Sequence, residues 1–360
     1  MSPPFLKQVR KSLIKNIPQN YPVGRLFKLR NIVLKITLQC NSNCIACQMR
    51  REKYKEIMQK KERTMQLSDY EKLFGDAKKI GLKRVVISGG EPTLSPDCIE
   101  IIGLIKGLNL CCILNTNGFN LGKIYKEILN MGIDEVVLSL DSLQSKIHNQ
   151  LRRCEGLWER AVAALNDLNN FKKEKRFKSR ITIRSILTKY FLEDLDQLIN
   201  FARRYGIDSW KLDYVEADYE NKIFLPSESD IKRWQSEGLP KMLQAINSSL
   251  YSRSKKNNLK EEVKKIFYLP NMSEKEISAG IYRKNVSECD CPEYFALIYP
   301  NGDIWPCIGL DYRKDHVMGN LFYDGIVNIF RNKSYRDMRN KTIDWCVYCP
   351  DNKIVLETAQ

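Results

Sequence analysis

Three cysteines stand close together near the beginning of the chain, in the stretch ITLQCNSNCIACQMRR. Cys40, Cys44 and Cys47 have three and two residues between them, and the next cysteine along the chain is Cys98. A closed structural zinc or iron–sulfur site uses four protein ligands. Three thiolates leave one coordination position open, where a small molecule can bind. The spacing therefore predicts a metal site that performs chemistry.

A glycine-rich turn carries the second candidate site. The segment VVISGGEPTL, residues 85–94, ends an apolar run with Gly89, Gly90, Glu91 and Pro92. Consecutive glycines let a backbone approach a ligand closely, and a carboxylate beside them can accept hydrogen bonds from an ammonium group. An ordinary turn between a strand and a helix is the alternative. Because the cysteine loop lies one structural unit earlier, the segment favours a ligand site.

Small polar or charged side chains lie at the ends of three further apolar runs. NTNG and SLDS place Asn117, Ser139 and Asp141 after two candidate strands, and Arg184 lies on a third. A guanidinium group suits carboxylate binding. Asn and Asp are also common in turns, and Arg184 could equally form an outward-facing ion pair. These four residues are candidate ligand contacts.

The elements that must position these residues alternate between strand and helix. Apolar runs typical of buried parallel strands occur at residues 32–38, 84–88, 111–115, 135–140, 181–187 and 210–215. Helical patterns occur at 66–81, where Ser68 and Glu71 should form a capping box, and at 96–108, 122–131, 156–170 and 191–205. Such units predict an α/β fold, a partial (β/α)6 TIM-like barrel with ligands at the C-terminal ends of its strands.

The chain is predicted to divide into four segments. Residues 1–30 form a basic helical segment, 31–216 the partial barrel, 217–288 a helical linking region and 289–360 a C-terminal extension. In the extension, Asn301-Gly302 between two apolar runs is typical of a β-hairpin, and a helix is expected near residues 325–340. The extension is therefore predicted to be a small hairpin-plus-helix unit.

Charge and cysteine content limit the classes of partner. The formal net charge is +16, from 59 Lys and Arg against 43 Asp and Glu, which favours acidic or phosphorylated partners. The basic runs lack a stacking-aromatic module, so nucleic acid is not expected. No apolar run reaches the ~20 residues of a membrane span. Twelve cysteines without a recognisable secretion signal indicate a reducing compartment, and we expect a cytoplasmic protein.

The cysteine loop and the glycine-rich turn together resemble the radical S-adenosylmethionine (SAM) superfamily. Cys40, Cys44 and Cys47 are similar to its cluster loop, and Gly89–Pro92 resembles its GGEP motif. The resemblance implies a [4Fe–4S] cluster whose fourth iron is chelated by SAM. It also implies an external electron donor such as flavodoxin or ferredoxin, cleavage of SAM to a 5′-deoxyadenosyl radical, and oxygen sensitivity.

The same resemblance assigns expected contacts with SAM. It implies that Gly89–Pro92 bind the amino group, that Asn117, Ser139 and Asp141 meet the ribose and methionine parts, and that Arg184 meets the carboxylate. The residue before the third cysteine is usually aromatic in this family, and here it is Ala46. Packing against the adenine edge is therefore expected to be looser or supplied from elsewhere.

The C-terminal cysteines resemble the SPASM/twitch extension of some radical SAM enzymes. Cys291, Cys307, Cys346 and Cys349 match the hairpin and later CxxC that hold an auxiliary [4Fe–4S] cluster in that extension, and Cys289 could replace Cys291. Only 11 residues follow Cys349 and none is cysteine, so the shorter, twitch-like form is expected. The alternative is a structural zinc site with four thiolate ligands.

The expected function is reductive cleavage of SAM followed by hydrogen abstraction from a small-molecule or peptide substrate. Families with this extension tailor peptides or sugar and aminocyclitol natural products, and oxidation, epimerisation and peptide modification all stay open. Cys154 is a candidate hydrogen donor, because some radical SAM epimerases use a thiol, and Arg152 and Arg153 beside it are candidate anion binders. The alternatives are an RNA-modifying radical SAM enzyme and a non-enzymatic iron–sulfur electron carrier.

Overall fold

The computed structural model describes residues 28–47, 49, 63–213, 224–249, 252–253, 256–257, 260, 291–308 and 316–340. The predicted N-terminal segment, residues 1–30, lies outside the described residues except for its last three. Within the described part of the chain, no helix has the length and apolar character needed to span a membrane.

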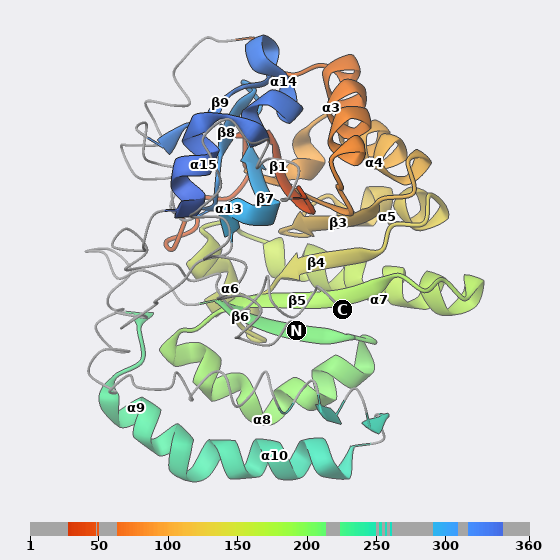
Figure 1. Ribbon diagram of the computed structural model, residues 1–360. Helices are drawn as coiled ribbons and strands as arrows, with labels where there is room; N and C mark the ends of the chain where they lie inside the picture. Colours follow the sequence, from red (N-terminus) through yellow and green to blue (C-terminus); the bar gives the residue numbers. More distant parts are fainter. Residues whose placement is uncertain are drawn as a thin grey trace.

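A curved parallel sheet with helices packed against it forms the core (Figure 1). Six strands lie side by side in chain order: β1 (Asn31–Thr37), β2 (Arg84–Gly89), β3 (Cys111–Thr116), β4 (Glu135–Ser139), β5 (Arg180–Ile186) and β6 (Ser209–Asp213). All neighbouring pairs among them are parallel. These are the six predicted strands, and the predicted α/β partial barrel is confirmed.

Helices connect these strands as the sequence predicts, with one addition. They are α3 (Leu67–Lys79), α4 (Cys98–Gly107), α5 (Leu121–Asn130), α6 (Ser145–Arg152), α7 (Leu157–Lys175) and α8 (Lys189–Arg204). The short helix α6 was not predicted, because it is only two turns long. The predicted capping box was misplaced: α3 begins earlier, and the Gln66 N–H donates to the Asp69 carboxylate at 2.9 Å.

The C-terminal extension continues the core sheet. Strand β7 (Phe295–Ile298) runs parallel to β1, and β8 (Asp303–Trp305) and β9 (Gly319–Asn320) follow antiparallel. The sheet order is therefore β6-β5-β4-β3-β2-β1-β7-β8-β9. The turn between β7 and β8 lies at Asn301-Gly302, where Gly302 has a φ of 81°, so the predicted hairpin is confirmed.

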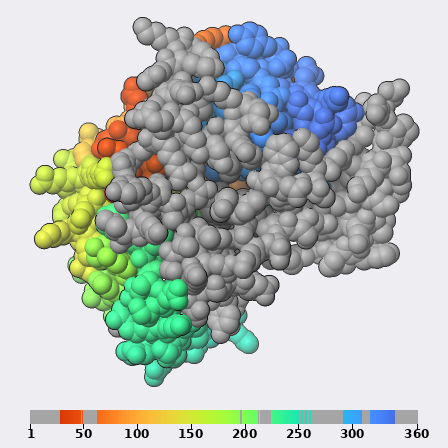
Figure 2. Space-filling model, turned by 90° about the vertical axis from the view of Figure 1, so that its left-hand side faces the viewer, coloured from red at the N-terminus to blue at the C-terminus, as the bar shows by residue number. Residues whose placement is uncertain are grey.

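Helices cover the two ends of the described molecule. The four-residue helix α13 (Cys291–Tyr294) precedes β7, and α14 (Leu321–Arg331) and α15 (Lys333–Asn340) follow β9. In the predicted linking region, α9 (Glu228–Arg233), the π-helical turn η5 (Trp234–Gly238) and α10 (Leu239–Ser248) form a continuous run. Figure 2 shows this run, in green, at the opposite end of the molecule from α14 and α15, in blue.

Strand β1 lies between two hydrophobic clusters. Ile32, Leu34 and Ile36 pack into the main core with the helices, whereas Val33 packs against the cluster of the C-terminal strands. Both faces of the strand are thus covered, as a parallel sheet requires. Strand β7 pairs with β1 only from Asn31 to Leu34, whereas β2 pairs with it as far as Thr37, after which the cysteine loop begins.

Candidate functional site

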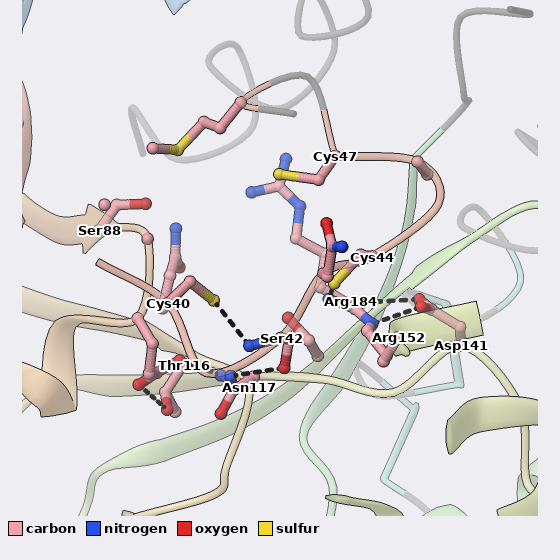
Figure 3. Close-up of a pocket in the computed structure, with 18 of the residues that line it drawn as sticks. Cys40, Ser42, Cys44, Cys47, Ser88, Thr116, Asn117, Asp141, Arg152 and Arg184 are labelled. Carbon is pink, nitrogen blue, oxygen red and sulfur yellow. Dashed lines mark hydrogen bonds and ion pairs between the residues drawn. The ribbon is translucent and has the colours of Figure 1, made fainter. Parts of the chain in front are cut away.

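The C-terminal ends of the strands surround a cavity of about 920 Å³. Its lining includes all three cysteines of the predicted loop with Asn117, Asp141 and Arg184 (Figure 3). It also includes Ala46, Gly89, Gly90, Glu91 and Ser139. Pro92 follows Glu91 in the chain and is buried at the start of a short 3-10 helix, Pro92–Leu94. The structure therefore brings together the site residues predicted from three separate motifs.

The two glycines let the cysteine loop lie directly against the end of β2. The Gly90 N–H donates to the Thr37 carbonyl, and the Glu91 N–H donates to the Gln39 carbonyl, both at 2.8 Å. A Cβ on Gly89 would lie 2.2 Å from the Thr37 oxygen, and a Cβ on Gly90 would lie 2.1 Å from the Gln39 oxygen. The φ of Gly89 is 143°, which also favours glycine. Besides lining the cavity, the glycines make room for protein backbone.

Helix α6 holds the other side of the loop. The N–H groups of Asn43 and Ile45 donate to the carbonyls of Arg152 and Leu151, at 3.2 and 3.0 Å. Ile45 is also buried in a small hydrophobic cluster with Leu151. Because these contacts flank Cys44 on both sides, the end of α6 fixes the backbone that carries its sulfur.

The Glu91 carboxylate is 1% exposed and is engaged by the protein. Its Oε1 accepts from the hydroxyls of Thr93 and Thr116, both at 2.6 Å, and from the Thr93 N–H at 3.2 Å. Its Oε2 accepts from the Asn117 N–H at 2.7 Å. Glu91 therefore ties the end of β2 to the end of β3. Its contact with a SAM ammonium stays a prediction.

Asn117 links β3 to the cysteine loop. Its Nδ2 donates to Asn41 Oδ1 at 2.8 Å and to Ser42 Oγ at 3.3 Å (Figure 3). Its Oδ1 accepts from the Phe119 N–H at 2.9 Å. The side chain is thus committed to holding the loop, while its predicted contact with SAM is untested. Ser139, at the end of β4, is half-buried and lines the same cavity.

A buried ion pair joins Asp141, after β4, to Arg152, at the end of α6. The Asp141 oxygens lie 2.5 Å from Arg152 Nε and 2.8 Å from Nη2. Asp141 Oδ1 also accepts from the Ile186 N–H at 3.0 Å. Burial alone would lower the pKa of Arg152, but Asp141 and Cys44 raise it, so the guanidinium stays charged. Arg152 is committed to this pair, while Arg153 is exposed.

His148 supports this ion pair from within α6. Its Nδ1 accepts a hydrogen bond from the Asp141 N–H at 3.1 Å. The side chain is fully buried, and burial lowers its pKa to about 4. The ring is therefore neutral and carries its proton on Nε2. Its acceptor nitrogen helps to fix the backbone of Asp141.

A second ion pair lies on the cavity wall formed by β5 and β6. Arg184 Nη2 lies 3.1 Å from Asp213 Oδ1, and Arg184 Nε also contacts this carboxylate. The two side chains are 30% and 24% exposed, and both residues line the cavity. Arg184 thus forms an ion pair, which was the alternative to a ligand contact, but this pair faces the cavity and not outward. Its contact with a SAM carboxylate stays a prediction.

Four cysteines lie in the chain between the cysteine loop and the C-terminal cysteines. Cys98 and Cys112 are buried and Cys111 is half-buried, as expected of small apolar side chains. Cys154 follows α6, and its N–H donates to the Asn149 carbonyl at 3.1 Å. Cys154 is absent from the described lining of the cavity, so the geometry gives no support to its predicted role as hydrogen donor.

Two of the predicted auxiliary ligands lie in the hydrophobic cluster of the C-terminal strands. Cys291 and Cys307 are buried in one cluster with Phe295, Leu297, Tyr299 and Trp305. Leu38, which lines the cavity, packs against this cluster. Cys289, Cys346 and Cys349 lie outside the described residues.

The donor set of the cysteine loop fits a [4Fe–4S] cluster. Among the residues that the structure describes, no three His, Cys, Asp or Glu side chains converge on one point, as a single metal ion would require. A cubane cluster needs no such convergence, because each thiolate binds a different iron. Desolvation raises the pKa of Cys40 to about 11 and also raises that of Cys44. When these thiols bind the iron of a cluster, they must therefore release their protons.

Several residues that hold this site were not identified from the sequence. Thr116 directly follows the predicted strand 111–115, and Asp213 lies near the end of the predicted strand 210–215, so their position was a usable signal. Asn41 lies inside the cysteine loop and could have been considered with it. His148 belongs to the helix that was not predicted. Arg152, in the same helix, was named from the sequence only as a candidate anion binder, and nothing in its spacing relates it to Cys44.

Comparisons with known proteins agree with this site. Residues 34–202 match the family model of the radical SAM superfamily, and residues 289–350 match SPASM, an iron–sulfur cluster-binding domain. A probable GTP 3′,8-cyclase of Pyrococcus abyssi is 34% identical over 121 residues, which cover 34% of this chain and 38% of that protein. The GTP 3′,8-cyclase of Shewanella denitrificans is 29% identical over 229 residues, which cover 62% of each chain. The matches thus span less than two thirds of these relatives.

Solved structures show the same fold over most of the chain. SuiB of Streptococcus suis bound to S-adenosylmethionine aligns with a TM-score of 0.60 and 18% identity, over 93% of this chain and 78% of that one. The structure named anSMEcpe with bound AdoMet aligns with a TM-score of 0.55 and 15% identity, over 86% and 82%. The two matched models imply an iron–sulfur cluster and SAM. The chain therefore contains a radical SAM domain, followed by a SPASM domain.

Proposed function

We propose that this protein cleaves SAM reductively at a [4Fe–4S] cluster bound by Cys40, Cys44 and Cys47, and then removes a hydrogen atom from a bound substrate. The observation that carries the proposal is that these cysteines and the glycine-rich turn Gly89–Glu91 line one cavity. When bound, the cluster and SAM supply the electron and the radical, as in other cofactor enzymes.

The chain itself supplies position and charge. Glu91 and Asn117 fix the ends of β2 and β3 against the cysteine loop. The cavity volume of about 920 Å³ lies near the upper end for small-molecule pockets, about 300–1,000 Å³. Gly89–Pro92, Asn117, Ser139, Asp141 and Arg184 are the proposed contacts with SAM, and the Arg184–Asp213 pair presents partly exposed charges to the remaining space.

We propose a peptide or a natural-product intermediate, acidic or phosphorylated, as the substrate. The net charge of +16 supports an anionic partner. A SuiB structure contains its precursor peptide SuiA, which supports a peptide. The relatives named GTP 3′,8-cyclase support a phosphorylated nucleotide as a second candidate. We further propose flavodoxin or ferredoxin as electron donor, and an auxiliary [4Fe–4S] cluster at Cys291, Cys307, Cys346 and Cys349, with zinc as the alternative.

The proposal is tested by metal content after anaerobic reconstitution. We expect about eight irons per wild-type chain and about four in the Cys40/Cys44/Cys47→Ala variant, since each cubane holds about four. Cys111→Ala is the matched control, because this half-buried cysteine lies at the other end of β3. With SAM and dithionite, the wild type and the control should form 5′-deoxyadenosine, and the triple variant should form none.

Each other outcome identifies a different error. Iron binding without 5′-deoxyadenosine in the wild type would favour a non-enzymatic electron carrier. About four irons falling to none, with zinc present, would make the C-terminal cysteines a structural zinc site. Co-purifying nucleic acid that competitively lowers the yield of 5′-deoxyadenosine would favour the RNA-modifying alternative. Formation of 5′-deoxyadenosine by the triple variant would refute the proposed site.

A further inference from the structure

The sulfurs of Cys40 and Cys44 have different hydrogen-bond donors. Cys40 Sγ accepts from a neutral donor, the Ser42 N–H, at 3.4 Å. Cys44 Sγ lies 3.8 Å from a charged donor, Arg152 Nη1 (Figure 3). Charge-assisted hydrogen bonds are roughly twice as strong as neutral ones. Cys44 is therefore distinguished from Cys40 by the cation beside it.

Arg152 is held in place by groups that do not belong to the loop. Its Nε and Nη2 bind both oxygens of Asp141, which is 1% exposed and is itself fixed by the Ile186 N–H. The carbonyl of Arg152 accepts from the Asn43 N–H, so backbone and side chain both reach the loop beside Cys44. The third guanidinium nitrogen is thus aimed at Cys44 by a prebuilt framework.

We propose that Arg152 is a positioning residue that sets the reduction potential of the cluster through its contact with Cys44. The inference rests on the proposed function, because it assumes that Cys44 binds the cluster. Reduction adds one negative charge, and a cation close to the cluster stabilises the reduced state. Hydrogen bonds to the sulfurs and local charge are two factors that set such potentials. Because the guanidinium is largely buried, salt screens this effect little.

The test is a redox titration without SAM, monitored by EPR. The signal to monitor belongs to the cluster that the Cys40/Cys44/Cys47→Ala variant lacks. Arg152→Gln removes the charge and should lower the midpoint potential. Arg152→Lys keeps a cation beside Asp141 but lacks the guanidinium that reaches both Asp141 and Cys44. Its midpoint potential should therefore lie between those of the wild type and Arg152→Gln. Arg153→Gln is the matched control, because it removes the same charge from the neighbouring exposed residue. It should keep the wild-type potential.

The outcomes separate this inference from the proposed function. Equal potentials for Arg152→Gln and Arg153→Gln would overturn the inference while leaving the cluster site intact. Arg152→Gln leaves a buried carboxylate unpaired and can lose the fold. In that case Arg152→Lys decides, since a wild-type potential in that variant would equally overturn the inference. A wild-type protein without a cluster at these cysteines would refute the proposed function itself.

Discussion

The substitution Glu91→Gln separates a structural role of this residue from a ligand-binding one. The carboxylate accepts four hydrogen bonds, two from threonine hydroxyls and two from backbone N–H groups. A glutamine amide keeps one acceptor oxygen and places an NH₂ group where the other oxygen was. If that NH₂ takes the place of Oε2, it faces the Asn117 N–H, and two donors then oppose each other.

The magnitude follows from these contacts. A hydrogen bond to a charged group contributes about 1.5–3 kcal/mol, and a buried donor left unsatisfied costs about 1–3 kcal/mol. Because Glu91 is 1% exposed, water cannot compensate. We expect Glu91→Gln to lower the free energy of unfolding by about 2.5–6 kcal/mol, a large share of the about 5–15 kcal/mol typical of folded proteins.

The assay is urea unfolding of the cluster-free protein, monitored by circular dichroism. Glu100→Gln is the matched control, because Glu100 is exposed on α4, and its effect should stay within about 0.5 kcal/mol. If Glu91→Gln unfolded at the same urea concentration as Glu100→Gln, the buried carboxylate would not hold β2 to β3. A loss confined to SAM affinity would instead show that Glu91 acts only as a ligand contact.

Two further predictions concern backbone contact and pH. Gly90→Ala places a Cβ about 2.1 Å from the Gln39 carbonyl oxygen, so it should prevent iron binding at the cysteine loop. The control Gly103→Ala, whose Cβ meets nothing within 4 Å, should bind iron normally. Normal iron content in Gly90→Ala would contradict the close approach of the two backbones. The pKa of His148 is about 4 in the folded protein, lowered by burial from 6.5. The unfolded state therefore binds the extra proton first, and stability should fall as pH drops from about 6.5 to about 4, by up to about 3 kcal/mol. In His148→Gln, urea midpoints across this range should show a smaller pH dependence, and an unchanged dependence would assign the effect to other groups.

The sequence indicated most of the fold because its signals were local. Each of the six core strands is a short apolar run with turn residues after it, and parallel strands place those ends at one edge of the sheet. The cysteine loop and the glycine-rich turn each follow such a run, so their meeting in one cavity followed from topology. The hairpin at Asn301-Gly302 was equally local. The short helix α6 and the start of α3 depended on weaker signals.

By itself, the sequence determined which residue types could bind a cluster, at what spacing, and after which strands. Only the tertiary structure decided what each polar group bonds to, because partners far apart in the chain compete for it. Glu91 reaches Thr116, Asn117 reaches the cysteine loop, and Arg184 reaches Asp213. Strand β7 joins β1 across more than 250 residues, and Arg152 meets Cys44 across 108. Local spacing contains no information about such contacts, since they depend on how the whole sheet curves and packs.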